Sequence, residues 1–364
     1  MSDALQKTIT LLLLIALGLL LRGKFKSKDQ TNGIKEIILS VALPSTIFIS
    51  LMKIDVDSSM IIIPLVTLVF NFLMFFSAPV AFALFGIEKN SPTGRTLLML
   101  IPSLAPGLSC FPFIAEFLGE KSLAIAALAD VGNKFFVLIS LYILAMNMFL
   151  KNSHDKETKM GGKLKSLFGN MLQEPINVLI ILALVLLGFG INYKTLPFFL
   201  TEIFDKTSAM MTPLVLLFIG LAVQLKEGKK AIVTSILLFR AGSTMLISAA
   251  MIFVLNISDQ SMILLAIVIP LSAASFWPLA HISAFNLRED ALGLSKEKRT
   301  FDMELAVLLL AFSLPFSTIL ILGILSTGAM FTHLSTLIIA GVVLIALGGL
   351  PNLFGRFALK KSNA

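Results

Sequence analysis

Three polar residues interrupt the apolar run 121–150, and their types and spacing could do chemistry: Asp130, Asn133 and Lys134. A charged side chain at the depth of a membrane costs about 2.5–3.5 kcal/mol, so it usually faces a cavity or a partner. Asp130 and Lys134 stand four residues apart, on one face of a helix, and could neutralise each other as a brace. Alternatively, Asp130 and Asn133 could help to bind a coupling cation, or Lys134 could attract an anion. The neighbouring Gly132 would let another helix approach closely.

Two further stretches combine prolines and serines in apolar surroundings, IPSLAPGLSCFPF (101–113) and IPLSAASFWPLAH (269–281). Proline removes a backbone donor and clashes with the preceding turn, so each stretch should break a helix. The N-terminal end of a broken helix exposes unpaired N–H groups and a partial positive charge, which together suit an anion. The residues that we expect to bind a substrate there are Pro106, Gly107, Ser109, Pro112, Ser275 and Pro278.

Individual side chains in these regions have alternative roles. The hydroxyls of Ser109 and Ser275 could donate to a substrate carboxylate, or they could pack and bond back to their own helix. His281, one turn after Pro278, could titrate during proton coupling or be a hydrogen-bonded bystander. Arg240 lies near the end of an apolar segment, where snorkelling of its guanidinium toward the interface explains it.

The sequence lacks the residue patterns of metal binding, ATP binding and enzyme catalysis. The single cysteine, Cys110, excludes an internal disulfide and a cysteine-rich metal site, and the three histidines are far apart in sequence. A GxxxxGK[ST] phosphate loop is absent from the sequence, so ATP is not the evident energy source. Clustered nucleophiles, bases or metal ligands are not visible either. We therefore expect neither an enzyme nor a cofactor, and the coupling ion, proton or sodium, stays open.

The composition places all these residues in a membrane. The chain is 57% hydrophobic and 14% charged, with a mean hydropathy of +0.95, whereas a soluble domain carries about 25% charged residues. Lipid is the solvent that accepts such an apolar surface. Apolar runs of membrane length predict eleven helical segments, near 4–21, 34–52, 60–86, 94–118, 121–150, 174–191, 207–225, 232–256, 261–286, 302–325 and 332–350.

The basic residues are distributed unevenly between the two sides that these segments define. Of the 29 Lys and Arg, 22 lie in the C-terminal tail and in or at the edges of the loops that follow odd-numbered segments, whereas 5 lie at the N-terminus and in or at the edges of the other loops. The positive-inside rule then predicts a multi-pass protein of the cell membrane with its N-terminus outside and its C-terminus cytoplasmic. The net charge of +8 is thus a topology signal. We expect contact with membrane lipid and none with nucleic acid.

The two broken segments match each other. Residues 109–112 and 275–278 both read Ser-x-aromatic-Pro, and the second stretch comes five segments after the first, so equivalent helices run in opposite directions. Paired interruptions of this kind point to the central site of a transporter. We predict an inverted repeat with a first five-helix unit at 1–150, a cytoplasmic linker at 151–173, a second unit at 174–325, and an extra helix with a basic tail at 326–364.

Three stretches carry a resemblance to the auxin efflux carrier family. ALPSTIFISL (42–51) resembles its second helix, PFIAEFLGEKSLAIAALADVGNKFFVL (112–138) resembles a PLAxxLFGxxxLAxAALYDxGN motif, and TPLVLLFIGLAVQL (212–225) resembles an APLALLLLGLxLAL helix. That family includes bacterial malate and malonate permeases and the plant auxin exporters. The resemblance implies ten helices in two inverted repeats, helices 4 and 9 broken and crossing, and organic anions as substrates.

The chain also departs from that family. Its members often have Asn-x-Gly ahead of the crossing in helix 4, with the asparagine near the substrate. The matching residues here are Ala105, Pro106 and Gly107, so the amide is absent. The substrate, or the way it is held, could therefore differ from that of the better-known members. The eleventh helix is extra as well.

The sequence thus predicts a secondary carrier of small organic anions, such as mono- or dicarboxylates, that exposes the crossing alternately to each side. A sodium-coupled symporter of the bile-acid-symporter-like fold is the alternative, and it would need acidic and amide ligands near the crossing. A channel is a less suitable interpretation, because two broken helices fit a closed central site better than an open pore. The short, peripheral segment 4–21 could form a homodimer surface.

Overall fold

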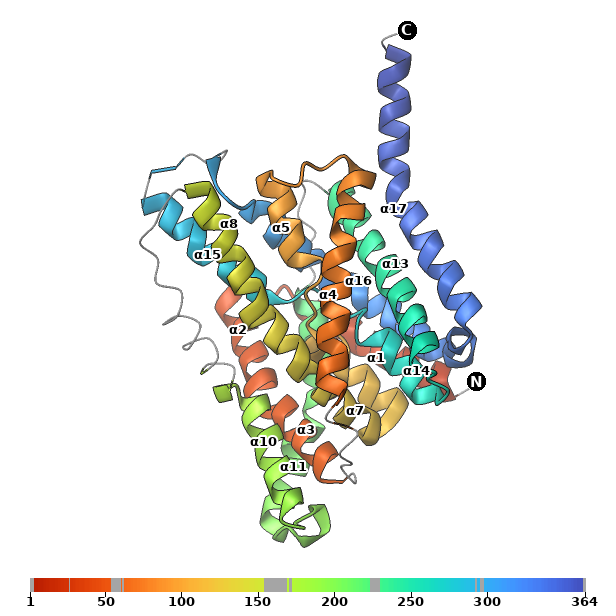
Figure 1. Ribbon diagram of the computed structural model, residues 1–364. Helices are drawn as coiled ribbons and strands as arrows, with labels where there is room; N and C mark the ends of the chain where they lie inside the picture. Colours follow the sequence, from red (N-terminus) through yellow and green to blue (C-terminus); the bar gives the residue numbers. More distant parts are fainter. Residues whose placement is uncertain are drawn as a thin grey trace.

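The computed structural model describes residues 3–25, 27–53, 60, 62–153, 169, 172–222, 230–291, 293–294 and 298–362. Most of the expected cytoplasmic linker lies outside these residues. Within them the chain is built from helices, and its only β-type pairing is an isolated antiparallel bridge between Ala105 and Ala273. Long apolar helices make up most of the molecule (Figure 1). The prediction of an all-α polytopic membrane protein is therefore confirmed.

The elements follow the predicted segments closely. The first half contains α1 (Asp3–Leu21), α2 (Lys28–Ile37), the π-helix η1 (Ile38–Ala42), α3 (Leu43–Met52), α4 (Ile62–Phe85), α5 (Pro92–Leu100), α6 (Pro106–Ser109), α7 (Phe111–Phe135), the π-helix η3 (Phe136–Ser140) and α8 (Leu141–Ser153). The second half contains α10 (Pro175–Gly188), the 3-10 helix η4 (Tyr193–Thr195), α11 (Phe198–Ala209), α12 (Met211–Ala222), α13 (Lys230–Val254), α14 (Gln260–Val268), α15 (Phe276–Ala291), α16 (Met303–Thr327), the 3-10 helix η6 (Gly328–Thr332) and α17 (Leu334–Ser362).

Six helical stretches of the described chain are long and apolar enough to cross a membrane. Three shorter apolar helices, Gln6–Leu21, Pro175–Gly188 and Leu334–Leu350, correspond to the first, sixth and eleventh predicted segments. The fourth and ninth predicted segments are the interrupted ones. Each begins with a helix of 9 residues, α5 or α14, and resumes as a helix only after an irregular turn.

A second kind of interruption separates the fourth predicted segment from the fifth. Gly119, inside α7, has a φ of 80°. This left-handed conformation is strained for a residue with a Cβ, so glycine is the residue that allows the chain to turn there. Residues 111–118 therefore belong to the first interrupted segment, and residues 120–135 continue through η3 into α8.

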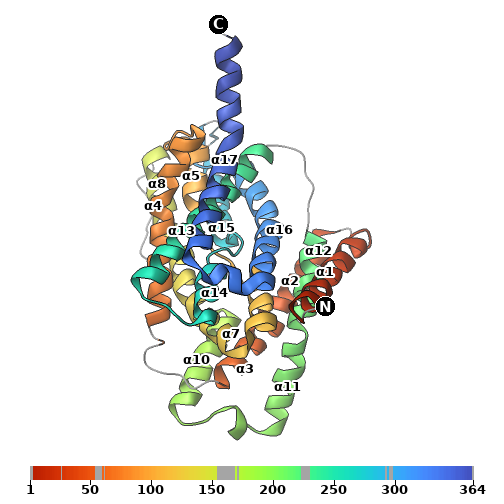
Figure 2. The same ribbon diagram turned by 90° about the vertical axis from the view of Figure 1, so that its right-hand side faces the viewer.

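The helices form two groups that meet along α7 and along α16, which contacts α1 and α12. In the first group, α1 packs on α12, α10 and α11 pack on α3, and α12 packs on α2. In the second group, α4 packs on α7 and α13, while α15 and α16 pack on each other and on α5. Helix α7 also contacts α3 and α12, which places it at the boundary between the groups. Figure 2 shows α1, α11 and α12 on one side of the molecule and α4, α5, α8 and α13 on the other.

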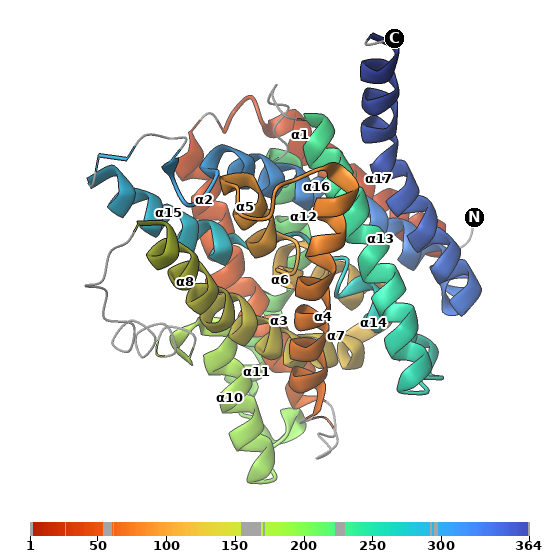
Figure 3. The same cartoon turned by 45° about the horizontal axis from the view of Figure 1, so that its top comes forward.

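Glycines bring some helices into backbone contact. The extra helix α17 lies along α13 (Figure 3), where a Cβ on Gly242 would lie 2.5 Å from the carbonyl oxygen of Gly341. In the same way, a Cβ on Gly132 of α7 would lie 1.8 Å from the carbonyl oxygen of Pro64 in α4. The prediction that Gly132 admits a neighbouring helix is confirmed.

Candidate functional site

The two interrupted segments cross, and a short antiparallel contact joins them. The Ala105 N–H donates to the carbonyl oxygen of Ala273 at 2.9 Å. The N–H groups that follow in the second interruption each donate to a serine hydroxyl. These pairs are Ala273 with Ser109, Ala274 with Ser313 and Ser275 with Ser103, at 2.9, 3.2 and 3.1 Å. Serine hydroxyls therefore occupy the backbone donors of residues 273–275 in this conformation.

One buried arginine binds the backbone acceptors of the crossing. Arg240 of α13 is 3% exposed, and its guanidinium donates to the carbonyl oxygens of Ile101, Ser103 and Ser272 at 3.1, 2.7 and 2.8 Å. These carbonyls follow the C-terminal ends of α5 and α14, where the helix dipole is negative and C=O groups lack helical partners. The expectation that Arg240 snorkels to the interface is wrong, because the two breaks offer it unpaired acceptors inside the protein.

A cavity of ≈ 560 Å³ opens beside the crossing, between the two helix groups. This volume is in the range of sites for small organic molecules. Its polar lining residues are Lys35, Glu36, Ser40, Asp130, Asn133, Lys134, Glu174, Ser275 and Ser313. The single tryptophan of the chain, Trp277, lines the cavity as well.

Asn133 connects this cavity to the first interruption. Its Nδ2 donates to the carbonyl oxygen of Leu104 at 3.0 Å and to Oδ1 of Asp130 at 2.8 Å. Its Oδ1 accepts a hydrogen bond of 2.9 Å from Nδ2 of Asn71 in α4. Asn133 is 2% exposed and Asp130 5%. The amide therefore holds the broken backbone, α4 and the Asp130 carboxylate in one buried network.

Lys134 lies between two carboxylates that belong to different helix groups. Its Nζ is 3.7 Å from Oδ2 of Asp130 on its own helix and 2.6 Å from Oε2 of Glu174. It also donates to Oδ1 of Asn177 at 3.3 Å. Glu174 is the N-cap residue of α10. The ion pair therefore links α7 of the second group to α10 of the first.

The lining of the cavity includes a second cation, Lys35. Nζ of Lys35 in α2 lies 4.9 Å from the ring centroid of Phe276, the first residue of α15, in a cation–π contact. Next to it, Ser40 Oγ donates to Oε1 of Glu36 at 2.6 Å. Both α2 and α7 continue beside the cavity as π-helices, η1 and η3. Such turns are frequent at functional sites.

The structure divides the residues predicted from the sequence into two sets. Those that line the cavity are Pro106, Gly107, Ser275, Asp130, Asn133 and Lys134. Those that are not part of its lining are Ser109, Pro112, Pro278 and His281. Ser109 braces the crossing instead, because its hydroxyl donates to the carbonyl oxygen of Ala105 at 2.8 Å. The Nε2 atom of His281 lies 2.9 Å from the carbonyl oxygen of Val137, behind the cavity wall.

Sequence reasoning missed several residues of the cavity and the crossing, among them Arg240, Lys35 and Glu174. Arg240 carried a usable signal, since an ionisable residue inside an apolar helix is by default a candidate for a functional site. Lys35 and Glu174 carried none, because they stand at the ends of apolar segments like ordinary loop charges. Only the packing of α2 and α10 against the crossing brings them to the cavity.

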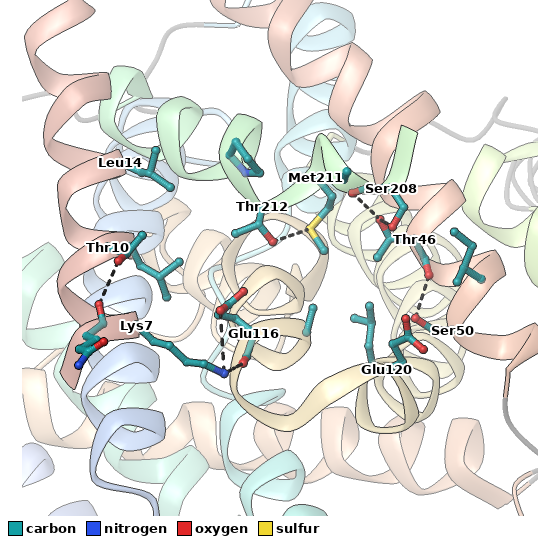
Figure 4. Close-up of a pocket in the computed structure, with 17 residues that line it drawn as sticks. Lys7, Thr10, Leu14, Thr46, Ser50, Glu116, Glu120, Ser208, Met211 and Thr212 are labelled. Atoms are coloured by element: carbon teal, nitrogen blue, oxygen red, sulfur yellow. Dashed lines mark hydrogen bonds and ion pairs between the residues drawn. The ribbon is translucent and has the colours of Figure 1, made fainter. Parts of the chain in front are cut away.

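A second cavity, of ≈ 730 Å³, lies among α1, α3, α7 and the junction of α11 and α12 (Figure 4). Its wall is rich in hydroxyls, and Ser208 Oγ donates to Oγ1 of Thr46 at 3.0 Å. Lys7 reaches across it and donates to the carbonyl oxygen of Glu116 at 2.8 Å. Both helix groups therefore bound this cavity, as they bound the first one.

Comparisons with known proteins find a distant relative. No protein-family model matches the chain. A curated protein of Methanocaldococcus jannaschii, described as Uncharacterized transporter MJ1031, is 26% identical over 227 residues, which cover 59% of this chain and 69% of that protein. The chain is thus similar to a protein described as a transporter, and its apolar helices are those of a multi-pass membrane protein.

Proposed function

We propose that this multi-pass membrane protein is a secondary carrier of small organic anions, such as mono- or dicarboxylates. The observation that carries the proposal is the cavity at the crossing of two interrupted helices, bounded by both helix groups. Irregular backbone at membrane depth is tolerated where protein or a water-filled cavity satisfies it. In secondary transporters, discontinuous helices of this kind form the substrate site.

The charges around the cavity suggest how an anion would be held. The lining carboxylates of Glu36, Asp130 and Glu174 face the lining ammonium groups of Lys35 and Lys134, and Arg240 adds a cation behind the crossing. The negative and positive charges of these side chains are therefore close to balance. An entering carboxylate would compete with Glu174 for Lys134, and the positive N-terminal end of α15 would help to hold it.

This competition would couple binding to movement. Because the Lys134–Glu174 pair links the two helix groups, its exchange for a Lys134–substrate pair would remove the charged link between α10 and α7. One group could then rock against the other and expose the site to the opposite side. The second cavity, which both groups also bound, is the candidate for the alternate entrance.

The packing of the helices supports the inverted repeat that this mechanism uses. In the predicted repeat, α1 corresponds to α10 and α3 to α12. The contact of α1 with α12 then has its counterpart in the contact of α3 with α10, and the contact of α4 with α7 in that of α13 with α16. We propose that the chain belongs with the auxin efflux carriers, and this architecture and the motifs in residues 42–51, 112–138 and 212–225 support the proposal.

The direct test is solute counterflow in proteoliposomes. Labelled malate would be exchanged against a panel of unlabelled mono- and dicarboxylates, with neutral amides of the same size as controls. We expect exchange with some carboxylates and none with the amides. No exchange with any carboxylate, from protein that elutes as a folded species in detergent, would contradict the proposal.

Binding can be measured separately from transport through Trp277. Because it is the single tryptophan and lines the cavity, a carboxylate bound there should change the intrinsic fluorescence in a saturable way. The variant Trp277→Phe should lack the signal, which identifies its source. A fluorescence change that amides produce equally would argue against an anion site.

A further inference from the structure

We propose that Arg240 is a resident cation of the crossing, so that anion transport by this protein needs no coupling sodium ion. The inference rests on the proposed function, because it specifies the cation chemistry of the same site. It assigns Arg240 a positioning role: the residue does not line the cavity, and it acts on the substrate through the backbone of the two breaks.

The geometry places the guanidinium where a coupling cation would bind. In ion-coupled carriers with broken helices, unwound backbone carbonyls and half-helix C-terminal ends coordinate the sodium ion. Here the corresponding acceptors are the carbonyl oxygens of Ile101, Ser103 and Ser272, and Arg240 binds all three within 3.1 Å. The three carbonyls come from both interrupted segments, so one cation joins the two breaks.

The charge of Arg240 is directed at the backbone alone. Among the described residues no carboxylate forms an ion pair with it, and it is 3% exposed. A guanidinium stays protonated in proteins, so it is a permanent charge that cannot be released and rebound during a transport cycle. Its positive charge offsets the negative C-terminal ends of α5 and α14.

The other candidate for a cation site is already in use. Oδ1 of Asp130 accepts from Asn133 at 2.8 Å, and its Oδ2 lies 3.7 Å from Nζ of Lys134. The amide oxygen of Asn133 accepts from Asn71. A sodium ion would have to displace Lys134 and rebuild this buried network. The acidic and amide ligands that a sodium-coupled symporter requires are therefore engaged with protein groups.

Two measurements on the intact protein test this inference. The first is counterflow of the wild-type protein with sodium replaced by choline on both sides of the membrane. We expect less than about a twofold change in rate, because the crossing carries its own cation. A wild-type exchange that requires sodium would overturn the inference and leave the proposed function standing.

The second measurement removes the guanidinium. Arg240→Ala should lower exchange by more than about tenfold, because three buried carbonyls lose their charged partner. Millimolar guanidinium or sodium, which can enter the space left behind, should restore part of the exchange in a saturable way. The matched control is Arg95→Ala, which removes another arginine that donates to a backbone carbonyl, that of Thr300 at 2.8 Å, outside the crossing. Guanidinium should not raise the exchange rate of this control.

Thermal stability in detergent separates the two proposals if the wild-type protein exchanges no anion. Guanidinium and sodium should then still raise the Tm of the Arg240→Ala protein by about 2 °C or more and leave that of the wild-type protein unchanged. If Arg240→Ala does not fold, Arg240→Gln, which keeps amide donors but removes the positive charge, takes its place in both assays. A folded variant whose transport and Tm respond to neither cation would show that Arg240 is only a structural donor.

Discussion

The ammonium of Lys134 lies 2.6 Å from the carboxylate of Glu174, and this ion pair joins α7 to the N-cap residue of α10. The side chain of Lys134 is 9% exposed and that of Glu174 23%, so solvent screens the pair far less than a surface pair. The two residues belong to different helix groups, so the ion pair must break if the groups move apart.

Removing the Glu174 carboxylate should therefore strengthen anion binding. In Glu174→Gln, Lys134 keeps its ion pair with Asp130 at 3.7 Å but loses its closer carboxylate partner. A substrate carboxylate then meets less competition for Lys134 and should bind about three- to tenfold more tightly. Lys134→Gln should weaken binding. Titration of Trp277 fluorescence measures both. The control is Glu202→Gln, which breaks an exposed ion pair with Lys206 and should have no measurable effect. Weaker binding in Glu174→Gln would contradict the competition between Glu174 and the substrate.

The serine hydroxyls of the crossing should matter for stability more than serines elsewhere. Ser109→Ala leaves the buried N–H of Ala273 without its acceptor, which should cost about 1–3 kcal/mol. Ser77→Ala removes a hydroxyl that only bonds back to its own helix at Met74, and it should be close to neutral. Thermal unfolding in detergent compares the two. Equal Tm values for both variants would show that Ser109 does not brace the crossing.

Asn133 should be needed both for folding and for the cavity. Asn133→Leu keeps the branched shape of the side chain but leaves the Leu104 carbonyl and the Asn71 amide unpaired, so we expect a loss of about 2–3 kcal/mol in stability and weaker anion binding. Asn147→Leu is the control, because Asn147 lies exposed on α8. Tm and Trp277 titration measure the effects. An Asn133→Leu protein as stable as the control would exclude the buried network.

Two glycines should respond in opposite directions to the same substitution. A Cβ at Gly132 would meet the backbone of Pro64, so Gly132→Ala should separate α4 from α7 and destabilise by about 1–3 kcal/mol. A Cβ at Gly323 in α16 meets nothing within 4 Å, so Gly323→Ala should stabilise by about 0.5–1 kcal/mol through lower chain entropy. Yield after solubilisation and Tm report both. A tolerated Gly132→Ala would mean that α4 and α7 do not touch there.

The loop before α11 should show an alkaline transition. The hydrogen bond to Asp205 raises the pKa of Tyr193 from 10.0 to about 12. Because the folded-state pKa is the higher one, this contribution to stability is complete below a pH of 10.0 and is lost as the pH rises through about 12. Phenolate absorbance of Tyr142→Phe, which keeps Tyr193 as its only tyrosine, follows the titration. If Asp205→Asn leaves the titration midpoint where it was, Asp205 is not the cause.

The amino-acid sequence alone determined the membrane class, the eleven apolar segments and the two places where a helix must break. These features follow from local rules, since hydropathy selects lipid as the solvent and proline removes a backbone donor wherever it stands. The same rules indicated Asp130, Asn133 and Lys134, because polar groups inside an apolar run need partners.

Tertiary structure decided what those partners are. The carbonyl oxygens of residues 101, 103 and 272 lack helical partners and accept hydrogen bonds from the buried Arg240. The N–H groups of residues 273–275 donate to serine hydroxyls of other segments. Lys35 and Glu174 reached the cavity only because α2 and α10 pack beside it. Every one of these contacts joins segments far apart in the chain. Periodicity and composition describe a segment by itself, whereas the partner of a buried polar group depends on which other segment lies next to it.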